Sequence, residues 1–273
     1  MMDGSPRRPA GLPAAALLAA VLAATLLHSP TSALSPEEAG TVDPRAAEVA
    51  ARAMAALGGE KAWAATRFIR FTFAGRRTHV WDRWTGRHRL EGKTKEGEPY
   101  VVLENVATRE GKAWVGGQPA TGERAAELVE NAYAAWINDT YWLVMPYKLR
   151  DPGVILRYDG EEVLDGTPYD RLALSFEHVG LTPGDRYWAW INRSTGLMDR
   201  WAYVLEDQPA DADPTVWLWQ GWQRYGKIEL APLRRRVGEE RTLDLSPIEV
   251  SDAMPDAVFE SPETPAPAAP PGR

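Results

Sequence analysis

After Trp63 the chain is largely a succession of short segments that have the alternation of half-buried strands and are separated by turn residues. Ile69, Phe71 and Phe73 alternate with Arg70 and Thr72, so one face of that segment is apolar. Strands that follow one another through tight turns, without crossover helices, pair antiparallel. The sequence therefore predicts an α+β, mainly antiparallel β fold of about 8–11 strands. The further strands are expected at residues 78–89, 100–108, 113–115, 154–158, 169–178, 186–192, 197–205, 215–225, 227–236 and 242–250.

Two segments have helical spacing instead. Asp43-Pro44 combines an N-cap with proline at the first helical position, and Gly58-Gly59 is typical of a helix end. A second helix is expected over residues 122–137. Each helix has one apolar stripe, which must pack against the sheet. The stripes consist of Ala46, Val49, Ala50, Ala53, Met54 and Leu57, and of Ala125, Leu128, Val129, Ala132, Tyr133 and Trp136.

Residues 186–192 break the alternation, because Tyr187, Trp188, Ala189, Trp190 and Ile191 are apolar on both faces of a strand. The segment is part of a chain with 12 tryptophans. Strands with two apolar faces must be covered on both sides.

The turn that follows, Asn192-Arg-Ser-Thr-Gly196, fits a hairpin loop over residues 193–196 with glycine in the left-handed position. In that register Asn192 faces Leu197 and Trp188 lies opposite Trp201. One face would then hold Trp188, Trp190, Leu197, Trp201, Tyr203 and Leu205, and the other Tyr187, Ala189, Ile191, Met198, Arg200 and Val204.

Trp217 and Trp219 repeat the pattern on the next strand, so an aromatic patch is expected to cross three strands. Each aromatic side chain buries about 150–250 Å². Such a patch packs either as ordinary core or as the wall of a ligand site, and the sequence leaves both interpretations open.

The N-terminus resembles a secretory signal. Arg7 and Arg8 precede an apolar run over residues 14–27 and small residues up to Ala33, where we expect cleavage. The alternative is an uncleaved anchor, although the run is shorter than the roughly 20 residues of a membrane span. Residues 34–42 are expected to be a flexible lead-in, 43–260 a single domain, and 261–273 a disordered tail rich in proline and alanine.

Charge and cysteine content exclude several classes of function. Cleavage would remove two basic residues and one acidic residue and change the formal net charge from −7 to −8. An acidic chain lacks the basic footprint that nucleic-acid binding requires. The absence of cysteine excludes disulfides, thiolate metal sites and a lipobox.

No residue pattern indicates catalysis. His79, Asp82 and His88 are close in sequence, but their spacing matches no metal site, and we expect packed or solvated histidines. No nucleophile, phosphate-loop or zinc-protease motif occurs. The sequence therefore predicts no enzyme activity, no cofactor and no metal.

Three aspartates lie beside aromatic clusters. Asp139, Asp151 and Asp185 are expected to fix loops by accepting backbone N–H bonds, and a polar contact to a ligand is the alternative.

Several longer stretches resemble the outer-membrane lipoprotein carrier-like (LolA/LppX-like) superfamily. They are "AAEVAARAMAALGGEKAWAATRFIRFTF", "WINRSTGLMDRW", "NDTYWLVMPYKLRDPGV" and "SFEHVGLTPGDRYW", and the last two are similar to an uncharacterised exported bacterial branch. The resemblance implies a strongly curved, open half-barrel sheet whose concave side is closed by helices. In carrier members the space between sheet and helices receives acyl chains.

These observations give the hypothesis of an exported, periplasmic or extracytoplasmic monomer that holds a lipid or acylated molecule between the sheet and the helices. Transient contact with a membrane or envelope protein is expected. The alternative is a carbohydrate- or envelope-binding module that uses exposed aromatic rings beside Asp and Arg. The expected wall consists of Phe71, Phe73, Leu172, Leu174, Phe176, Trp188, Trp190, Trp201, Tyr203, Trp217 and Trp219, and the helix lid of Met54, Leu57, Leu128, Tyr133 and Trp136.

Overall fold

The computed structural model describes residues 43–176, 184–209 and 211–263. The predicted signal peptide, the lead-in and the predicted tail from residue 264 onward lie outside the described residues. Within the described ranges no helix combines the length and the hydropathy that crossing a bilayer requires.

The strands form two seven-stranded sheets and one two-stranded sheet, and all pairings are antiparallel. The α+β, mainly antiparallel fold is thus confirmed. The described strands number 16 rather than 8–11, because segments expected to be continuous are divided by turns; Gly221, at φ 76°, ends one strand inside residues 215–225. In spatial order the first sheet contains β16 (Glu249–Ser251), β1 (Phe68–Phe73), β2 (Arg77–Asp82), β3 (Arg87–Lys93), β4 (Pro99–Asn105), β5 (Glu110–Val115) and β6 (Gln118–Pro119). The second contains β15 (Thr242–Asp244), β14 (Leu233–Arg236), β11 (Thr215–Gln220), β10 (Met198–Val204), β9 (Arg186–Asn192), β8 (Thr167–Phe176) and β7 (Val154–Leu164), and the third pairs β12 (Gln223–Tyr225) with β13 (Ile228–Leu230).

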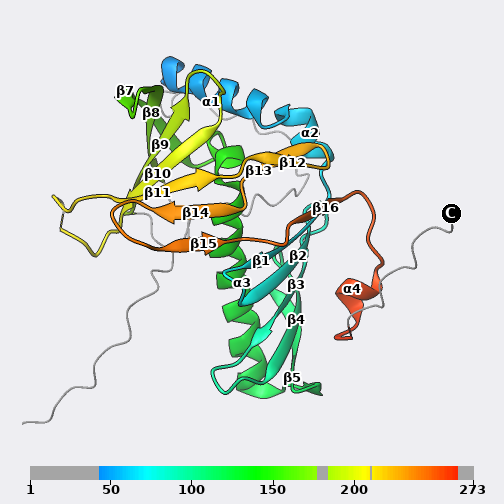
Figure 1. The fold of residues 1–273 in the computed structure, drawn as a ribbon. Helices are drawn as coiled ribbons and strands as arrows, with labels where there is room; N and C mark the ends of the chain where they lie inside the picture. The colour runs from blue at the N-terminus through cyan, green and yellow to red at the C-terminus, as the bar shows by residue number, and fades with distance from the viewer. Residues whose placement is uncertain (1–42, 177–183, 210, 264–273) are drawn as a thin grey trace, which may run out of the picture.

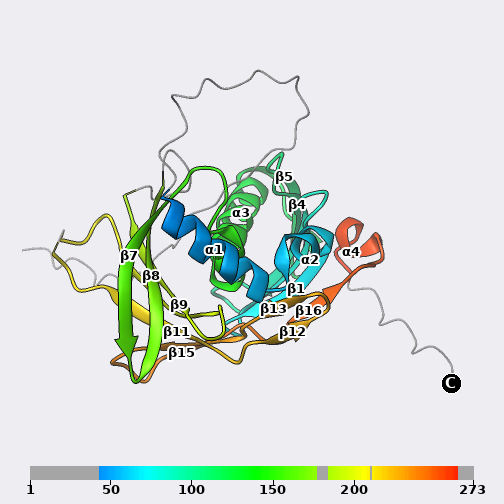
Figure 2. The ribbon, with the colours of Figure 1, turned by 90° about the horizontal axis from the view of Figure 1, so that it is seen from above.

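The two large sheets meet where β1 approaches the end of β15. The backbone N–H of Thr72 donates to Leu245 O at 3.3 Å and that of Ala74 donates to Asp244 O at 2.8 Å. Seen from above, the strands follow a curve that is open on one side, with the long helix inside it (Figure 2). This arrangement is the open half-barrel.

Five helical elements accompany the sheets: α1 (Pro44–Ala56), α2 (Gly59–Ala65), α3 (Gly122–Val144), the 3₁₀ helix η1 (Met145–Lys148) and α4 (Ala257–Glu260). The Asp43 side chain caps α1 by accepting from the N–H groups of Arg45 and Ala46, as predicted. Gly58 has φ 111°, and a Cβ there would lie 2.7 Å from Lys227 O, so glycine is required between α1 and α2.

The long helix α3 runs through the centre of the molecule, with the first sheet beside one half and the second sheet beside the other (Figure 1). It has 23 residues and ends at Val144, whereas the sequence predicted an end at Ile137. The polar run Asn138-Asp139-Thr140 interrupts the apolar stripe. Those residues are nevertheless buried, so the helix continues where the pattern ends.

The hairpin between β9 and β10 has the predicted loop but a different register. Asn192 N donates to Leu197 O at 2.8 Å and Gly196 has φ 76°, as expected. A register shift between Met198 and Arg200 leaves Asp199 as an extra residue. Its carboxylate accepts from the Asn192 side chain at 2.8 Å, which accounts for its displacement from the ladder.

The predicted pairing of Trp188 with Trp201 is therefore wrong. Trp201 pairs with Ala189, and Trp188 pairs with Ala202. A one-residue shift exchanges the two faces of a strand. Trp201 thus shares its face with Tyr187 rather than with Trp188.

Candidate functional site

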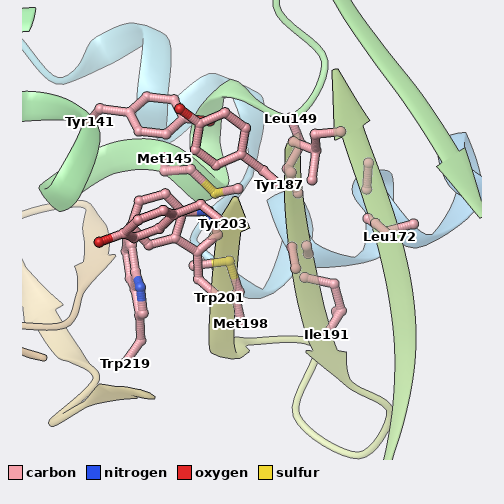
Figure 3. Packing of buried hydrophobic residues seen from close by; sticks show 14 of the residues in the cluster. Tyr141, Met145, Leu149, Leu172, Tyr187, Ile191, Met198, Trp201, Tyr203 and Trp219 are labelled. Carbon is pink, nitrogen blue, oxygen red and sulfur yellow. The ribbon is translucent and has the colours of Figure 1, made fainter. Parts of the chain in front are cut away.

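The concave face of the second sheet carries a ladder of aromatic side chains. Tyr187 stacks on Trp201 with centroids 5.8 Å apart, and Trp142 of α3 meets Trp201 and Trp217 edge-on at 4.8 and 5.2 Å. Figure 3 shows the rings of Tyr187 and Trp201 close to Tyr141 and Met145. Most of the ladder is therefore covered by α3.

The residues expected to form a wall are distributed over three clusters. One cluster on the concave face of the second sheet contains Leu172, Leu174, Phe176, Trp201, Tyr203, Trp217 and Trp219. A second, near the junction of the sheets, holds Phe71 with Leu57 and Met54, and Phe73 packs on both. Trp188 and Trp190 belong to a third cluster, on the opposite face of the second sheet. The structure thus groups most of the expected wall but removes these two tryptophans from it.

The residues expected to act as a lid on α3 contact the other sheet. Leu128 packs with Leu90 and Val102, whereas Tyr133 and Trp136 pack near Trp81. The helix residues that cover the aromatic ladder are Tyr141, Trp142 and Met145, beyond the predicted end of the helix. This role was not predicted from the sequence, although Trp142 and Met145 follow Tyr141 by one and four residues, a spacing that indicates a continued helix.

A cleft of about 950 Å³ opens where the two sheets and α3 meet. Phe73, Trp142, Tyr203, Trp217 and Leu243 line its apolar side, so one end of the aromatic ladder forms part of its wall. Polar and charged residues make up the rest of the lining. Ligand sites commonly have volumes of about 300–1,000 Å³, so by its size and its aromatic side this cleft is the candidate site.

Four arginines also line this cleft. Arg77 is paired with Asp139 at 2.8 Å, and Arg236 with Glu239 at 3.0 Å. The other two are exposed: Arg76 follows β1 in a tight turn, and Arg241 lies in the β14–β15 hairpin. The concentration of guanidinium groups contrasts with a chain whose formal net charge is −7.

The aromatic ladder leads directly to these arginines. Across the second sheet Trp201 pairs with Trp217, and Trp217 pairs with Arg236. The guanidinium carbon of Arg241 lies 5.7 Å from the Trp217 ring centroid. Burial raises the pKa of Tyr203, while the charges of Arg236 and Arg241 act in the opposite direction. Aromatic surface and positive charge therefore adjoin in one cleft.

Behind the cleft a further arginine is fully buried. Arg234 lies over the Trp219 ring, with its guanidinium carbon 3.4 Å from the centroid, and donates to Trp142 O in the last turn of α3. Burial lowers its pKa well below the ordinary value. A cation at this end of a helix satisfies free carbonyls and complements the helix dipole, so Arg234 secures the helix residues that cover the ladder.

A buried chain of hydrogen bonds connects α3 with the first sheet. Asp139 accepts two bonds from Arg77, at 2.8 and 2.9 Å, and one from His79 Nε2 at 2.8 Å. His79 Nδ1 lies 3.0 Å from His88 Nε2, and His88 Nδ1 lies 2.8 Å from Glu104 Oε1. The expectation that Asp139 fixes a loop is wrong, because it lies inside α3 and anchors that helix to β2.

Within this chain of hydrogen bonds, burial lowers the pKa of His79 to about 4, so its imidazole is neutral at pH 7. These hydrogen bonds connect α3 to β2, β3 and β4 of the first sheet. No cluster of metal-ligating groups occurs in the part of the molecule that the structure describes.

A second, smaller cleft of about 430 Å³ lies on the other side of Arg77. Its charges are mixed: Arg124 pairs with Glu127 at 2.9 Å, and Lys93 and Lys95 are accompanied by Glu96. Of these two clefts, the larger one combines several aromatic side chains with an excess of arginine over carboxylates among the described residues.

No protein-family profile matches this chain, and no curated protein matches its sequence. Solved structures similar to it include a DUF1329 family protein from Desulfovibrio piger (14% identity, 81% of this chain and 98% of that chain, TM-score 0.44) and a LolA superfamily protein from Nitrosomonas europaea (12% identity, 78% and 96%, TM-score 0.37). The lipoprotein LppX from Mycobacterium tuberculosis is a third (11% identity, 61% and 99%, TM-score 0.26). The superfamily that the sequence resembles is thus among the structures similar to this chain.

Proposed function

We propose that this protein binds an amphiphilic molecule, a lipid or an acylated compound, in the cleft between its two sheets. The observation that carries the proposal is the end of the aromatic ladder at the cleft, where Trp142, Tyr203 and Trp217 contribute to the wall of a space of about 950 Å³. An acyl chain on this wall would gain about 0.8 kcal/mol for each CH₂ group removed from water. Binding is non-covalent, and the predicted export would place it outside the cytoplasm.

The carbohydrate alternative receives less support from the packing of the aromatic residues. Stacking on a sugar requires an exposed ring. Among the described tryptophans Trp84 alone is exposed, at 59%, and its face is occupied by Arg67, 5.2 Å from the ring centroid. The amphiphile proposal therefore takes precedence.

The test is competition for the cleft between a neutral dye and a neutral lipid. Nile red fluorescence is titrated with the protein and displaced by monolauroylglycerol. The variant Ala134→Trp places an indole in the cleft, since Ala134 lines it and is half-buried. We expect about a tenfold loss of affinity for monolauroylglycerol, because the ring occupies the ligand's space.

The matched control is Ala126→Trp, on the same helix. Ala126 is exposed and lines neither cleft, so this variant should bind as the parent does. Absence of binding by the parent protein, or an equal loss in both variants, would refute the proposal. Binding to a glycan array without displacement of Nile red would favour the carbohydrate function.

A further inference from the structure

The larger cleft contains polar groups that a purely apolar ligand would leave without partners. Arg76 and Arg241 are exposed at its rim, and within the described ranges neither has a carboxylate at ion-pairing distance. Among the described residues that line the cleft there is one carboxylate, Asp244, which accepts from the N–H of Ser246 at 2.7 Å. Two guanidinium groups are therefore available to a ligand.

The rim is built by two turns that hold these arginines. Arg76 N donates to Phe73 O at 3.0 Å in the turn between β1 and β2. Arg236 N donates to Arg241 O at 2.9 Å across the hairpin of β14 and β15. The bond from Ala74 N to Asp244 O fixes the first turn against the second hairpin. The backbone positions of Arg76 and Arg241 thus follow from the junction of the sheets.

Inside the cleft a buried amide has a free acceptor. Asn138 is 9% exposed and lines the cleft. Its Nδ2 donates to Asp139 Oδ1 at 2.7 Å, which orients the amide. Its Oδ1 has no hydrogen-bond partner among the described residues. Buried polar atoms usually have partners, so an unpartnered carbonyl inside a cleft indicates a donor supplied by the ligand.

We infer that the ligand is an anionic amphiphile: its phosphate or carboxylate is bound by Arg76 and Arg241, a hydroxyl or amide N–H beside that group donates to Asn138 Oδ1, and its acyl chain lies on Trp217 and Tyr203. The inference rests on the proposed function and names the ligand class for the same cleft. Arginine suits this role because its planar fork binds phosphate and carboxylate oxygens in pairs.

The experiment compares four probes that differ in whether they contain a phosphate, a hydroxyl and a hydrocarbon chain. Lauroyl lysophosphatidate has a phosphate and a hydroxyl, monododecyl phosphate has no hydroxyl, and monolauroylglycerol has no charge; the fourth probe is inorganic phosphate. Dissociation constants are measured by displacement of Nile red or by calorimetry at 50 and 300 mM salt. We expect lysophosphatidate to bind about tenfold more tightly than monolauroylglycerol at low salt, with the difference decreasing at high salt because salt screens exposed charges. Loss of the hydroxyl should weaken binding several-fold.

Two double variants distinguish recognition by the arginines of the cleft from an effect of the protein's net charge. Arg76→Gln combined with Arg241→Gln should abolish the preference for lysophosphatidate over monolauroylglycerol. The control, Arg70→Gln combined with Arg235→Gln, removes the same charge from two exposed arginines that do not line the cleft, and should keep the preference.

The outcomes distinguish this inference from the proposed function. If neither amphiphile binds, the proposed function fails. If lysophosphatidate and monolauroylglycerol bind equally, or if the control pair loses the preference to the same extent, the function stands and the anionic class is refuted. Binding of monododecyl phosphate equal to that of lysophosphatidate would refute the role of Asn138. Inorganic phosphate binding as tightly as lysophosphatidate would show a free-anion site instead of an amphiphile site.

Discussion

The two halves of α3 differ in how much of their surface is buried by the rest of the protein. In the first half one stripe, with Leu128, Val129 and Ala132, packs on the first sheet, while most of the other residues are exposed or half-buried. In the second half every residue from Ala135 to Val144 is buried, because that half contacts both sheets. A helix with one buried face follows the rule of amphipathic spacing. A fully enclosed helix has no polar face, and its polar residues must find partners inside the protein.

The largest expected change in the free energy of unfolding comes from the aromatic contacts of the second half of α3. Trp142 meets three aromatic rings of the second sheet edge-on. Trp142→Ala should lower the free energy of unfolding by about 4 kcal/mol, because it removes a large buried side chain and leaves a cavity. Urea unfolding measures the change.

The matched comparison in the first half is Tyr133→Ala. Tyr133 is half-buried and packs on Trp136 and Arg109, so a loss of about 1 kcal/mol is expected. Equal losses at the two positions would contradict the distinction between the halves.

The next largest change in the free energy of unfolding is expected from Asp139, the carboxylate buried in the second half of α3. Asp139→Ala leaves Arg77 and His79 without their partner. Removing one member of a buried ion pair typically costs 3–5 kcal/mol, and we expect about 3 kcal/mol because Arg77 is 35% exposed and can turn toward water.

On the first half, Glu127→Ala breaks an exposed pair with Arg124 and should cost less than about 1 kcal/mol. Both variants are measured by thermal and urea unfolding. A cost for Asp139→Ala as small as that for Glu127→Ala would show that the buried chain does not stabilise α3.

The same difference explains how much could be predicted from the sequence. The strand alternation, the cap at Asp43 and the first half of α3 follow local rules, and they were predicted. The end of α3 was not, because Asn138-Asp139-Thr140 breaks the apolar period and is buried only through partners distant in sequence, such as Arg77. The joining of the two sheets into one open curve was not predicted either, because it depends on backbone hydrogen bonds between residues distant in sequence, such as Ala74 and Asp244.

The candidate site was predicted in part for a similar reason. The tryptophans of β10 and β11 follow from alternation, and the structure places Trp201 and Trp217 on one face. Trp188 was assigned to that face because no local signal revealed the extra residue at Asp199. The arginines that line the cleft come from separate strands and turns, so only the tertiary structure brings them together.

The last expected effect on the second half of α3 is the pH dependence of the buried histidine that joins it to β2. Burial lowers the pKa of His79 from its ordinary value of 6.5 to about 4. Between these pH values the unfolded chain binds a proton that the folded chain excludes, so stability is present above pH 6.5 and is lost as the pH falls toward 4. The loss from this group should reach about 2–3 kcal/mol.

The variant His79→Gln isolates this contribution. At pH 7 it should be less stable than the parent, since it disturbs the bond to Asp139. The difference between the two should narrow as the pH falls from 6.5 to 4 in urea titrations. Asp82 does not obscure this window: burial would raise its pKa, but hydrogen bonds from Arg67 and other donors outweigh that effect and lower it to about 2. If the difference in stability between parent and variant stays constant from pH 7 to pH 4, His79 takes up its proton as readily in the folded protein as in the unfolded chain. That result would contradict the lowered pKa of His79 in the folded protein.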